Sequence, residues 1–512
     1  MNVIKKSPII ALALVPLFFL FHNYNELFGF IPVSQLIYYA VIIYASLIIG
    51  YLIFRWMKVP PSKALLILFI TSIFLLFFDP IASLFKRVSF GSFFGSNLFL
   101  VPVCIIIIVF LIRRILRGES VSSNVITFLN IVMIFLFASE LAIGFSNFNQ
   151  YRKNKNLIYP YNIYSEKYTP SQLPDSAKPD IYFIVFDEYT NNKTLKKLWK
   201  FDNTPITRWL AANRFYVPEN THANYSVTIY SVSSTFNMNY IDAKKGSDAT
   251  VTRNILQANQ SVSDNETFNI LQQENYSINF IAPFKNRIRE NGLGKWFDYL
   301  IDHQIDMQTL PGKIIAHIKW HSQTGKWSDL DDDWYENILN TKLELLKNTL
   351  DQIKKSTDSN TDRQPHFVYG HFMIPHEPHL SFDSAGAPIP DQRPTNLPPF
   401  ATYPAQISYA NELMKDLVSY ILQHNKRNTI IIVEGDHGFR EFNLGPGWFM
   451  RTSDSLKRFF LPNFCAIYFP EKNYSRLYDH MSPVNTFRII FDQYFRQQFP
   501  LLKDSGIVVK DD

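Results

Sequence analysis

The chain has 512 residues, of which 47% are hydrophobic and 16% aromatic, enough for a membrane region and one large soluble domain. Its net charge is only +6, and much of the positive charge lies in short loops between apolar segments, which indicates membrane topology and argues against nucleic-acid binding. The two cysteines, Cys104 and Cys465, are far apart in sequence, so we expect no disulfide between them.

Five apolar segments fill residues 1–145 and predict membrane-spanning helices, each of which needs about 20 residues. They cover roughly 8–21, 35–54, 64–85, 98–112 and 125–145. The first segment is short and follows Lys5 and Lys6, so a signal peptide is the alternative interpretation. It lacks a small-residue cleavage site, and four more segments follow, which favours a membrane span.

The distribution of Lys and Arg predicts the orientation of these spans. The N-terminus and the loops at 55–63 and 113–120 are rich in positive charge, whereas the loop at 22–30 has none. Positively charged loops face the cytoplasm. An odd number of spans therefore puts the rest of the chain on the periplasmic or extracellular side of the cytoplasmic membrane. Glu140 lies near the outer end of the fifth segment, where we expect it to be exposed at the interface, and a functional role within the membrane is the alternative.

After a polar linker, apolar β-type runs alternate with helical patterns. Strands are predicted at 181–186, 278–284, 366–374, 429–435 and 465–469, and helices at 335–355 and 407–424. This alternation predicts an α/β fold with a central, largely parallel sheet covered by helices on both faces. We divide the chain into a five-helix transmembrane region (1–145), a linker (146–178), a soluble domain (179–500) and a C-terminal tail (501–512).

Two of the predicted strands end in charged residues. "IYFIVFDEYT" runs into Asp187 and Glu188, and "TIIIVEGDHG" runs into Asp436 and His437. Sites in parallel sheets gather at the carboxyl ends of strands. Carboxylates together with imidazole suit a divalent cation such as Zn or Mn. An acidic turn is the alternative for either motif alone, but together they predict a site for one divalent metal ion.

The stretch "HANYSVTIYSVSSTFNMNY" (222–240) offers a nucleophile, because it reads as a loop that enters a helix near Ser226–Thr228. A hydroxyl at a helix N-terminus lies where backbone amides and the helix dipole favour anions. Contact with a metal would favour the alkoxide of Thr228. The alternative is that this residue caps the helix, since Ser and Thr are common caps.

The order of these motifs resembles the sulfatase-like branch of the alkaline phosphatase superfamily, over roughly residues 178–500. The five-span anchor is similar to that of lipoteichoic-acid synthases and lipid A phosphoethanolamine transferases. Those enzymes take a phosphate-linked headgroup from a phospholipid and pass it to an acceptor outside the cytoplasmic membrane. The resemblance implies a sulfatase-like catalytic domain on a multi-pass membrane anchor.

The resemblance also implies roles for individual residues. By position, Glu188, Asp436 and His437 match metal ligands, and Asp187 matches the preceding acid of true sulfatases. Thr228 falls in "TIYSVSS", whose Thr-x-x-Ser spacing is similar to the nucleophile segment of the transferases. It would serve as both metal ligand and nucleophile.

The stretch "HFMIPHEPH" (371–379) resembles a region that supplies a His to the substrate. His376 is the best match, either to bind the anionic group or to protonate a leaving oxygen. His379 and His371 follow, and for His371 we prefer a structural role inside a strand. The stretch "SPVNTFRIIFDQYF" (482–495) resembles a terminal packing helix, with Arg488 expected on the surface or in an ion pair.

One departure from the family pattern matters. True sulfatases need a C/S-x-P-x-R motif for their formylglycine, and residues 222–240 hold none. We therefore expect a metal-dependent enzyme that transfers a phosphate-linked headgroup from a membrane lipid donor to an envelope glycan acceptor through a phosphothreonine. The alternatives are a phosphate- or sulfate-ester hydrolase and a catalytically inactive domain that binds a glycan or a partner.

Overall fold

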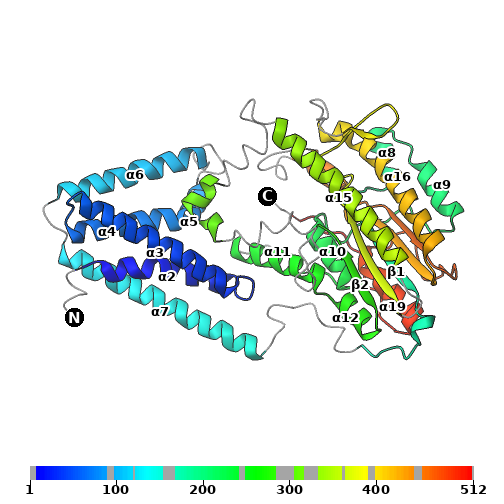
Figure 1. Ribbon diagram of the computed structural model, residues 1–512, viewed down its shortest axis with the longest axis horizontal. Coiled ribbons are helices and arrows are strands. Elements are labelled where there is room, and N and C mark those ends of the chain that lie inside the picture. The colour runs from blue at the N-terminus through cyan, green and yellow to red at the C-terminus, as the bar shows by residue number, and fades with distance from the viewer. Residues whose placement is uncertain are drawn as a thin grey trace. The chain divides into compact units, whose positions relative to one another are not determined.

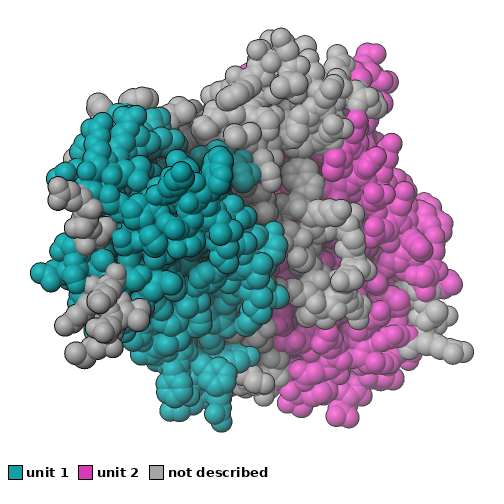
Figure 2. Space-filling view, turned by 60° about the vertical axis from the view of Figure 1, so that its left-hand side comes forward, with its two compact units in different colours: residues 1–158, 299–326 teal, residues 159–298, 327–512 magenta. Residues whose placement is uncertain are grey.

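In a computed structural model, the chain divides into two compact units (Figures 1 and 2). Unit 1 comprises residues 1–158 and 299–326, and unit 2 comprises 159–298 and 327–512. The structure describes residues 7–88, 97–118, 122–153, 168–241, 248–283, 305–315, 332–359, 364–389, 398–442 and 452–509.

Unit 1 is helical. Its helices are α2 (Ile9–Glu26), α3 (Val33–Trp56), α4 (Pro61–Leu76), α5 (Phe78–Val88), α6 (Asn97–Arg117) and α7 (Ser123–Lys153). Among the described residues, four helices are long and apolar enough to cross a membrane, and α4 with α5, bent by 60° at their junction, gives a fifth if counted as one span. The apolar segments predicted from the sequence are thus helical, and α7 continues eight residues beyond the predicted boundary at 145.

Glu140 corrects one prediction, because it is buried, with only 5% of its surface exposed. Its Oε2 accepts a hydrogen bond from Asn25 Nδ2 at 2.7 Å, and its Oε1 lies 2.9 Å from His22 Nδ1. At the other end of the same helix pair, Asn130 Oδ1 accepts from the backbone N–H of Ala11 at 2.8 Å. These polar contacts join α2 to α7, so the first apolar segment is an integral part of the helical unit. Sequence position alone does not reveal the partners that allow a carboxyl group to be buried.

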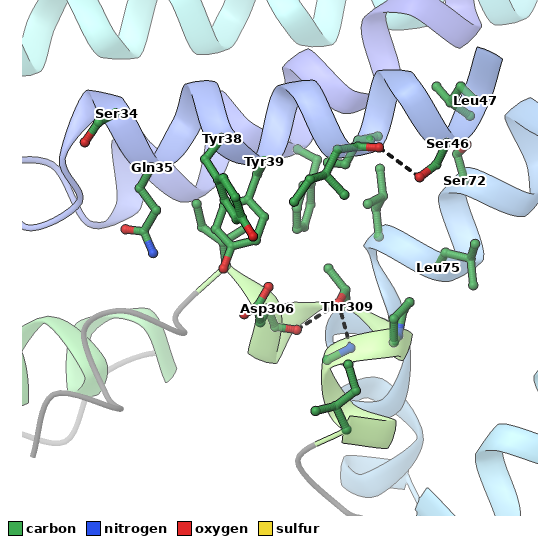
Figure 3. A pocket seen from close by; sticks show the side chains of 18 of the residues that line it. Ser34, Gln35, Tyr38, Tyr39, Ser46, Leu47, Ser72, Leu75, Asp306 and Thr309 are labelled. Carbon is green, nitrogen blue, oxygen red and sulfur yellow. Dashed lines mark hydrogen bonds between the residues drawn. The ribbon is translucent and has the colours of Figure 1, made fainter. Parts of the chain in front are cut away.

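Unit 1 also contains a segment from the middle of the chain, described over residues 305–315. Lys313 Nζ pairs with Asp79 at 2.6 Å, and Leu310 is buried with Phe78 and Leu100. This segment borders a cavity of about 840 Å³ among α2, α3 and α4. Figure 3 shows that Tyr39 lies near Asp306 at one side of the cavity, whereas Leu47 and Leu75 lie further along. The side chains of Tyr39 and Asp306 are hydrogen-bonded to each other.

Unit 2 is built on a five-stranded sheet in the order β2-β3-β1-β6-β7. The strands are β1 (Asp180–Phe186), β2 (Ser277–Ile281), β3 (His366–Phe372), β6 (Thr429–Gly435) and β7 (Cys465–Tyr468). All neighbouring pairs are parallel except β6 and β7. The largely parallel sheet predicted from the buried apolar runs is confirmed, with strands close to the predicted ranges. A separate hairpin pairs β4 (Ser381–Phe382) with β5 (Pro388–Ile389).

Helices cover both faces of the sheet, as the sequence predicts (Figure 1). Ile181, Phe183 and Val185 of β1 pack into one core with α10, α11, α12 and α19, and the alternate residues pack into a second core with α8, α9, α15 and α16. The bounds are α8 (Asn192–Trp199), α9 (Thr204–Ala212), α10 (Thr228–Phe236), α11 (Asp248–Ser263), α12 (Glu266–Gln273), α15 (Asp332–Asp358), α16 (Pro399–His424), α18 (Asp454–Lys457) and α19 (Thr486–Phe495). Because side chains alternate along a strand, a strand with both faces covered is apolar at every position.

Arg488 on α19 corrects the surface position that the sequence analysis allowed for it, because it is fully buried. Its Nε donates to the carbonyl oxygen of Met238 at 2.8 Å, and its Nη1 donates to that of Pro500 at 2.6 Å. Met238 follows the end of α10 with a left-handed φ of 51°, so its carbonyl lies outside the helical hydrogen-bond pattern. The guanidinium group therefore ties the end of α10 to the C-terminal part of the unit.

We predict that Arg488→Met lowers the thermal stability of the detergent-purified protein substantially. The substitution removes the donors of two buried carbonyl groups, each of which costs about 1–3 kcal/mol when left unsatisfied. Arg208→Met on α9, where the side chain is exposed, is the matched control and should change stability by less than about 0.5 kcal/mol. Equal unfolding temperatures for the two variants would contradict the role of Arg488.

Candidate metal centre

Two acids meet at one edge of the sheet because β1 and β6 are parallel neighbours in register. Phe186 is paired with Gly435, so the next residues, Asp187 and Asp436, leave the sheet side by side. On the other side of β1, Val185 pairs with His371 of β3. The carboxyl ends of three strands thus place two carboxylates and an imidazole at one edge, as expected for a parallel sheet.

These side chains lie around His437. Its Nε2 is 3.5 Å from Asp187 Oδ1, 3.7 Å from Asp436 Oδ2 and 3.2 Å from Thr228 Oγ1. His371 Nε2 lies 3.3 Å from Asp187 Oδ2. We call Asp187, Thr228, His371, Asp436 and His437 the primary cluster; every member is buried. Residues separated by about 250 positions in the chain therefore form one site.

Hydrogen bonds fix which atoms of the primary cluster face its centre. The Nδ1 of His437 lies 2.8 Å from the carbonyl of Gly438, which can only accept, so Nε2 carries the lone pair in the neutral ring. Asp436 Oδ1 accepts from the backbone N–H groups of Glu188 and His437, at 2.9 and 3.0 Å. Its Oδ2 and the Oδ1 of Asp187 are buried without a hydrogen-bond partner.

This arrangement fits a divalent cation. Ligand atoms of Asp187, His371 and Asp436 all lie within 4.8 Å of one another. Buried carboxylate oxygens without a partner are costly, and a cation would satisfy both of the orphaned oxygens. Carboxylates with imidazole suit Zn or Mn. The residues present therefore fit the metal that the sequence predicts, with Thr228 adjacent.

Thr228 is the first residue of α10, after the N-cap position at Val227, and its hydroxyl hydrogen-bonds with His437 Nε2 at 3.2 Å. The segment before it is held by the C-terminal tail. Ser226 N–H donates to the carbonyl of Ile507 at 3.1 Å, and Ile507 N–H donates back to Asn224 at 3.0 Å. Val509 N–H donates to Ser226 Oγ at 2.9 Å. The tail thus pairs like a strand with the approach to Thr228, and the threonine hydroxyl contacts His437 instead of its own helix.

Glu188 does not join the primary cluster. It adopts a left-handed backbone with φ of 67°, unusual for a residue with a side chain. Its carbonyl accepts from the Tyr403 hydroxyl at 2.5 Å, and its Oε1 accepts from the backbone N–H of Arg440. The turn therefore sends the carboxylates of Asp187 and Glu188 to different places.

The Glu188 carboxylate lies in a second cluster, which we define as Glu188, His376, His379 and Glu441. Ligand atoms of Glu188, His376 and Glu441 lie within 4.8 Å of one another. His379 Nε2 lies 3.1 Å from Glu441 Oε2. The rings of His376 and His437 are 6.3 Å apart, so the two clusters are neighbours.

Burial and nearby charges shift the protonation of this region. Burial raises the pKa of Asp187, but the charge of His376 and the hydrogen bond with His371 outweigh it and bring the pKa below its usual range. Burial and the Glu441 charge raise the pKa of Glu188 well above its usual value. The pKa of His437 is lowered, chiefly by burial, which favours the neutral ring that can act as a ligand.

Buried Lys342 on α15 supports the loop that carries His376. Its Nζ donates to the carbonyl oxygens of His376 and Pro378, at 2.6 and 2.8 Å. Burial lowers the pKa of Lys342 to about 8, although Glu441 and Asp187 act in the opposite direction. Nothing in the sequence around Lys342 marks it, because it is one of several lysines in an amphipathic helix.

Two further residues belong to these clusters, although the sequence motifs do not mark them as metal ligands. His371 is strand-buried, as expected, but its ring also faces Asp187. The sequence motifs do not include Glu441, although it lies only three residues after Gly438 of the Asp-His-Gly motif. Glu441 comes just after a strand end that carries two candidate ligands, Asp436 and His437. That position is the sequence signal for including it in the site.

A family model described as Sulfatase matches residues 202–487. The match begins after Asp187 and Glu188 and includes Thr228, His376, Asp436 and His437. A comparison with curated proteins gave no match.

Solved structures give distant likenesses. The C-terminal periplasmic domain of EcEptC from Escherichia coli aligns with a TM-score of 0.37 at 13% identity, covering 64% of this chain and 85% of that one. The integral membrane lipooligosaccharide phosphoethanolamine transferase A from Neisseria meningitidis aligns with a TM-score of 0.35 at 12% identity, covering 94% of each chain. At such low scores, neither likeness assigns a reaction to this chain.

We predict that Asp436→Asn weakens metal binding at the primary cluster and leaves the fold intact. Asparagine keeps an oxygen that can accept the two backbone hydrogen bonds, but it removes the negative charge that a cation needs. After equilibrium dialysis against Zn²⁺, elemental analysis should find less metal in the variant than in the wild type. Unchanged metal content at limiting Zn²⁺ would mean that Asp436 is not a ligand.

Proposed function

The chain belongs to the sulfatase family, and from this premise we propose that it is a membrane-anchored phosphotransferase. In this proposal it moves a phosphate-linked headgroup from a membrane lipid to an envelope glycan, outside the cytoplasmic membrane. The observation that carries the proposal is the contact between Thr228 Oγ1 and His437 Nε2, beside the two orphaned oxygens of Asp187 and Asp436. A hydroxyl at that point is suited to act as a nucleophile.

The membrane unit supports a lipid as the donor. Its apolar helices would hold the chain in the bilayer, where phospholipids are the most abundant phosphodiesters. The cavity beside α3 combines an apolar lining with polar groups such as Gln35 and Asp306. That combination suits an amphipathic molecule better than a soluble sugar phosphate.

In the first step, Thr228 Oγ1 attacks the phosphorus atom of the donor in line. The Oγ1–P bond forms as the bond from phosphorus to the glyceryl oxygen of the lipid breaks. The threonine proton passes to water, because the Nε2 of His437, which lies 3.2 Å from Thr228 Oγ1, is assigned to the cation. His376 protonates the departing glyceryl oxygen.

In the second step, a hydroxyl of the acceptor attacks the phosphothreonine, and Thr228 regains its proton. A divalent cation held by Asp187, Asp436 and His437 would supply charge stabilisation for the threonine oxygen and the transferring phosphoryl oxygens. Glu188 supports this site through its backbone N–H, which donates to Asp436. Its carboxylate points elsewhere.

Ester hydrolysis is the second candidate, favoured by the family match itself. If water attacks the same phosphothreonine in place of the acceptor, the enzyme acts as a phosphodiesterase. Sulfate-ester cleavage by formylglycine is disfavoured, since residues 222–240 lack C/S-x-P-x-R. A domain that only binds a glycan or a partner would give no turnover with any ester.

We predict that Thr228→Ala abolishes turnover of a phospholipid with a fluorescent headgroup, by at least about a thousandfold, because it removes the nucleophile. Intact-mass analysis should find a headgroup-phosphate adduct on the wild type and none on the variant. Stability should change by less than the cost of about 0.5–2 kcal/mol for a lost helix cap, since Val227 and not Thr228 occupies the N-cap position of α10.

Ser234→Ala is the matched control for Thr228→Ala, because it removes a buried hydroxyl from the same helix that donates to Asn239. It should keep its activity. Normal turnover in Thr228→Ala would end the nucleophile assignment and leave a hydrolase that activates water directly. A sulfate ester assayed in parallel separates the two ester classes.

The orientation of the chain in the membrane gives a separate prediction. Reporters that work only after export should be active when fused after residue 145 and inactive when fused within 55–63 or 113–119. The reason is the excess of Lys and Arg in those two loops. The reverse pattern would put the catalytic unit in the cytoplasm and exclude an envelope glycan as the acceptor.

A further inference from the structure

Tyr369 and His371 lie on the same face of β3, and both are fully buried. Residues two apart in a strand point to the same side of the sheet, so the phenol of Tyr369 can reach the imidazole. The Tyr369 hydroxyl lies 2.8 Å from His371 Nδ1, and the other ring nitrogen, Nε2, lies 3.3 Å from Asp187 Oδ2. These two contacts link the aromatic core beneath the sheet edge to the primary cluster.

The packing around Tyr369 accounts for its ring but not for its hydroxyl. The ring packs against Phe183 of β1, Phe236 of α10 and Phe280 of β2, at centroid distances of 5.7, 4.9 and 5.1 Å. A phenylalanine would suit this aromatic environment equally well. A buried hydroxyl needs a hydrogen-bond partner, and its partner in the described part of the chain is His371. The contact with the imidazole is therefore the reason for a tyrosine at this position.

The two contacts of His371 indicate where the imidazole proton lies. An ionised carboxylate only accepts hydrogen bonds, so the contact with Asp187 Oδ2 requires an N–H at Nε2. The neutral ring then has its lone pair on Nδ1, to which the Tyr369 hydroxyl donates. In the alternative tautomer, Nδ1–H donates to the hydroxyl and Nε2 offers its lone pair to a cation. The hydroxyl suits both tautomers, but only the first also gives Asp187 a donor.

The hydrogen bond from His371 determines which oxygen of Asp187 is available to a cation. With Oδ2 held by His371, Oδ1 is the oxygen without a hydrogen bond, and it lies 3.5 Å from His437 Nε2. Asp436 is arranged in the same way, because its Oδ1 accepts two backbone N–H groups and its Oδ2 has no partner. Each carboxylate thus presents one oxygen beside His437.

We propose that Tyr369 is a positioning residue of the metal centre. Its hydroxyl holds His371 in the tautomer with Nε2–H, so that His371 donates to Asp187 and is not itself a ligand. Groups that support the ligands of a metal typically change its affinity by about 10–100-fold when they are removed. The proposal concerns cation binding alone and stands whether or not the substrate is a lipid.

The test measures Zn²⁺ affinity of the full-length protein in detergent, prepared without a polyhistidine tag, by competition with a chromophoric chelator. Tyr369→Phe keeps the aromatic ring and removes the hydroxyl, so the imidazole can take the other tautomer and Asp187 loses its donor. We expect the affinity to fall by about 10–100-fold. The visible absorption spectrum of the Co²⁺-loaded protein, which reports the geometry of the ligands, should also shift.

His371→Gln distinguishes a hydrogen-bond donor from a ligand. The glutamine amide N–H can replace Nε2–H as the donor to Asp187, it has no tautomers, and its nitrogen offers no lone pair to a cation. We therefore expect this variant to bind Zn²⁺ with nearly the wild-type affinity. In the same background, Tyr369→Phe should have no further effect on affinity, because the hydroxyl acts through the imidazole.

Tyr276→Phe is the matched control, because Tyr276 is a buried tyrosine of the same core whose hydroxyl donates to the carbonyl of Pro179 at 2.6 Å. It should keep the wild-type affinity and spectrum. Unchanged or higher affinity in Tyr369→Phe overturns the proposal, and so does an equal loss in Tyr276→Phe. If Tyr369→Phe does not fold, as judged by thermal unfolding, His371→Gln decides, since loss of Zn²⁺ binding there would make His371 a ligand. Failure of lipid turnover alone would count only against the proposed function, because affinity is measured without substrate.

Discussion

The soluble unit is organised around buried negative charge at the carboxyl edge of a parallel sheet. Asp187 and Asp436 emerge side by side because β1 and β6 are in register, and neither is exposed to solvent. Such a pair is stable only if positive charge or hydrogen-bond donors surround it. The backbone N–H groups on Asp436 and the imidazole of His371 partly meet this need.

The backbone at Glu188 decides how that charge is distributed. An extended conformation would continue the strand and alternate the two acids across the sheet, whereas the left-handed turn ends the strand and separates them into two clusters. A non-glycine residue in this conformation stores strain of order 1–3 kcal/mol. The hydrogen bonds from Tyr403 to its carbonyl and from its N–H to Asp436 hold it there.

The sequence predicts the sheet well, because buried parallel strands are apolar at every position and their ends are marked by charged residues. It also brings Asp187, Asp436 and His437 into one hypothesis, since strand ends of one sheet share an edge. Thr228, at a helix start, joins that hypothesis through the family resemblance. It does not predict which way Glu188 points, because a single φ angle decides it.

The burial of charged residues is the second feature that the sequence does not predict. Arg488 and Glu140 look like surface residues by type, but both are buried against partners from distant segments. Lys342 likewise acts through a loop 34 residues away. Such partners follow from tertiary packing, which residue type and periodicity do not encode.

The pairing of the C-terminal tail with residues 224–226 has a consequence for the timing of synthesis. Ile507 and Val509 follow all five strands of the sheet in the chain, yet they hold the segment that precedes Thr228. Until they arrive, the nucleophile segment lacks its strand-like neighbour, although the membrane helices and most of the sheet have already been made. The approach to Thr228 is therefore complete only once residues 507–509 have been made.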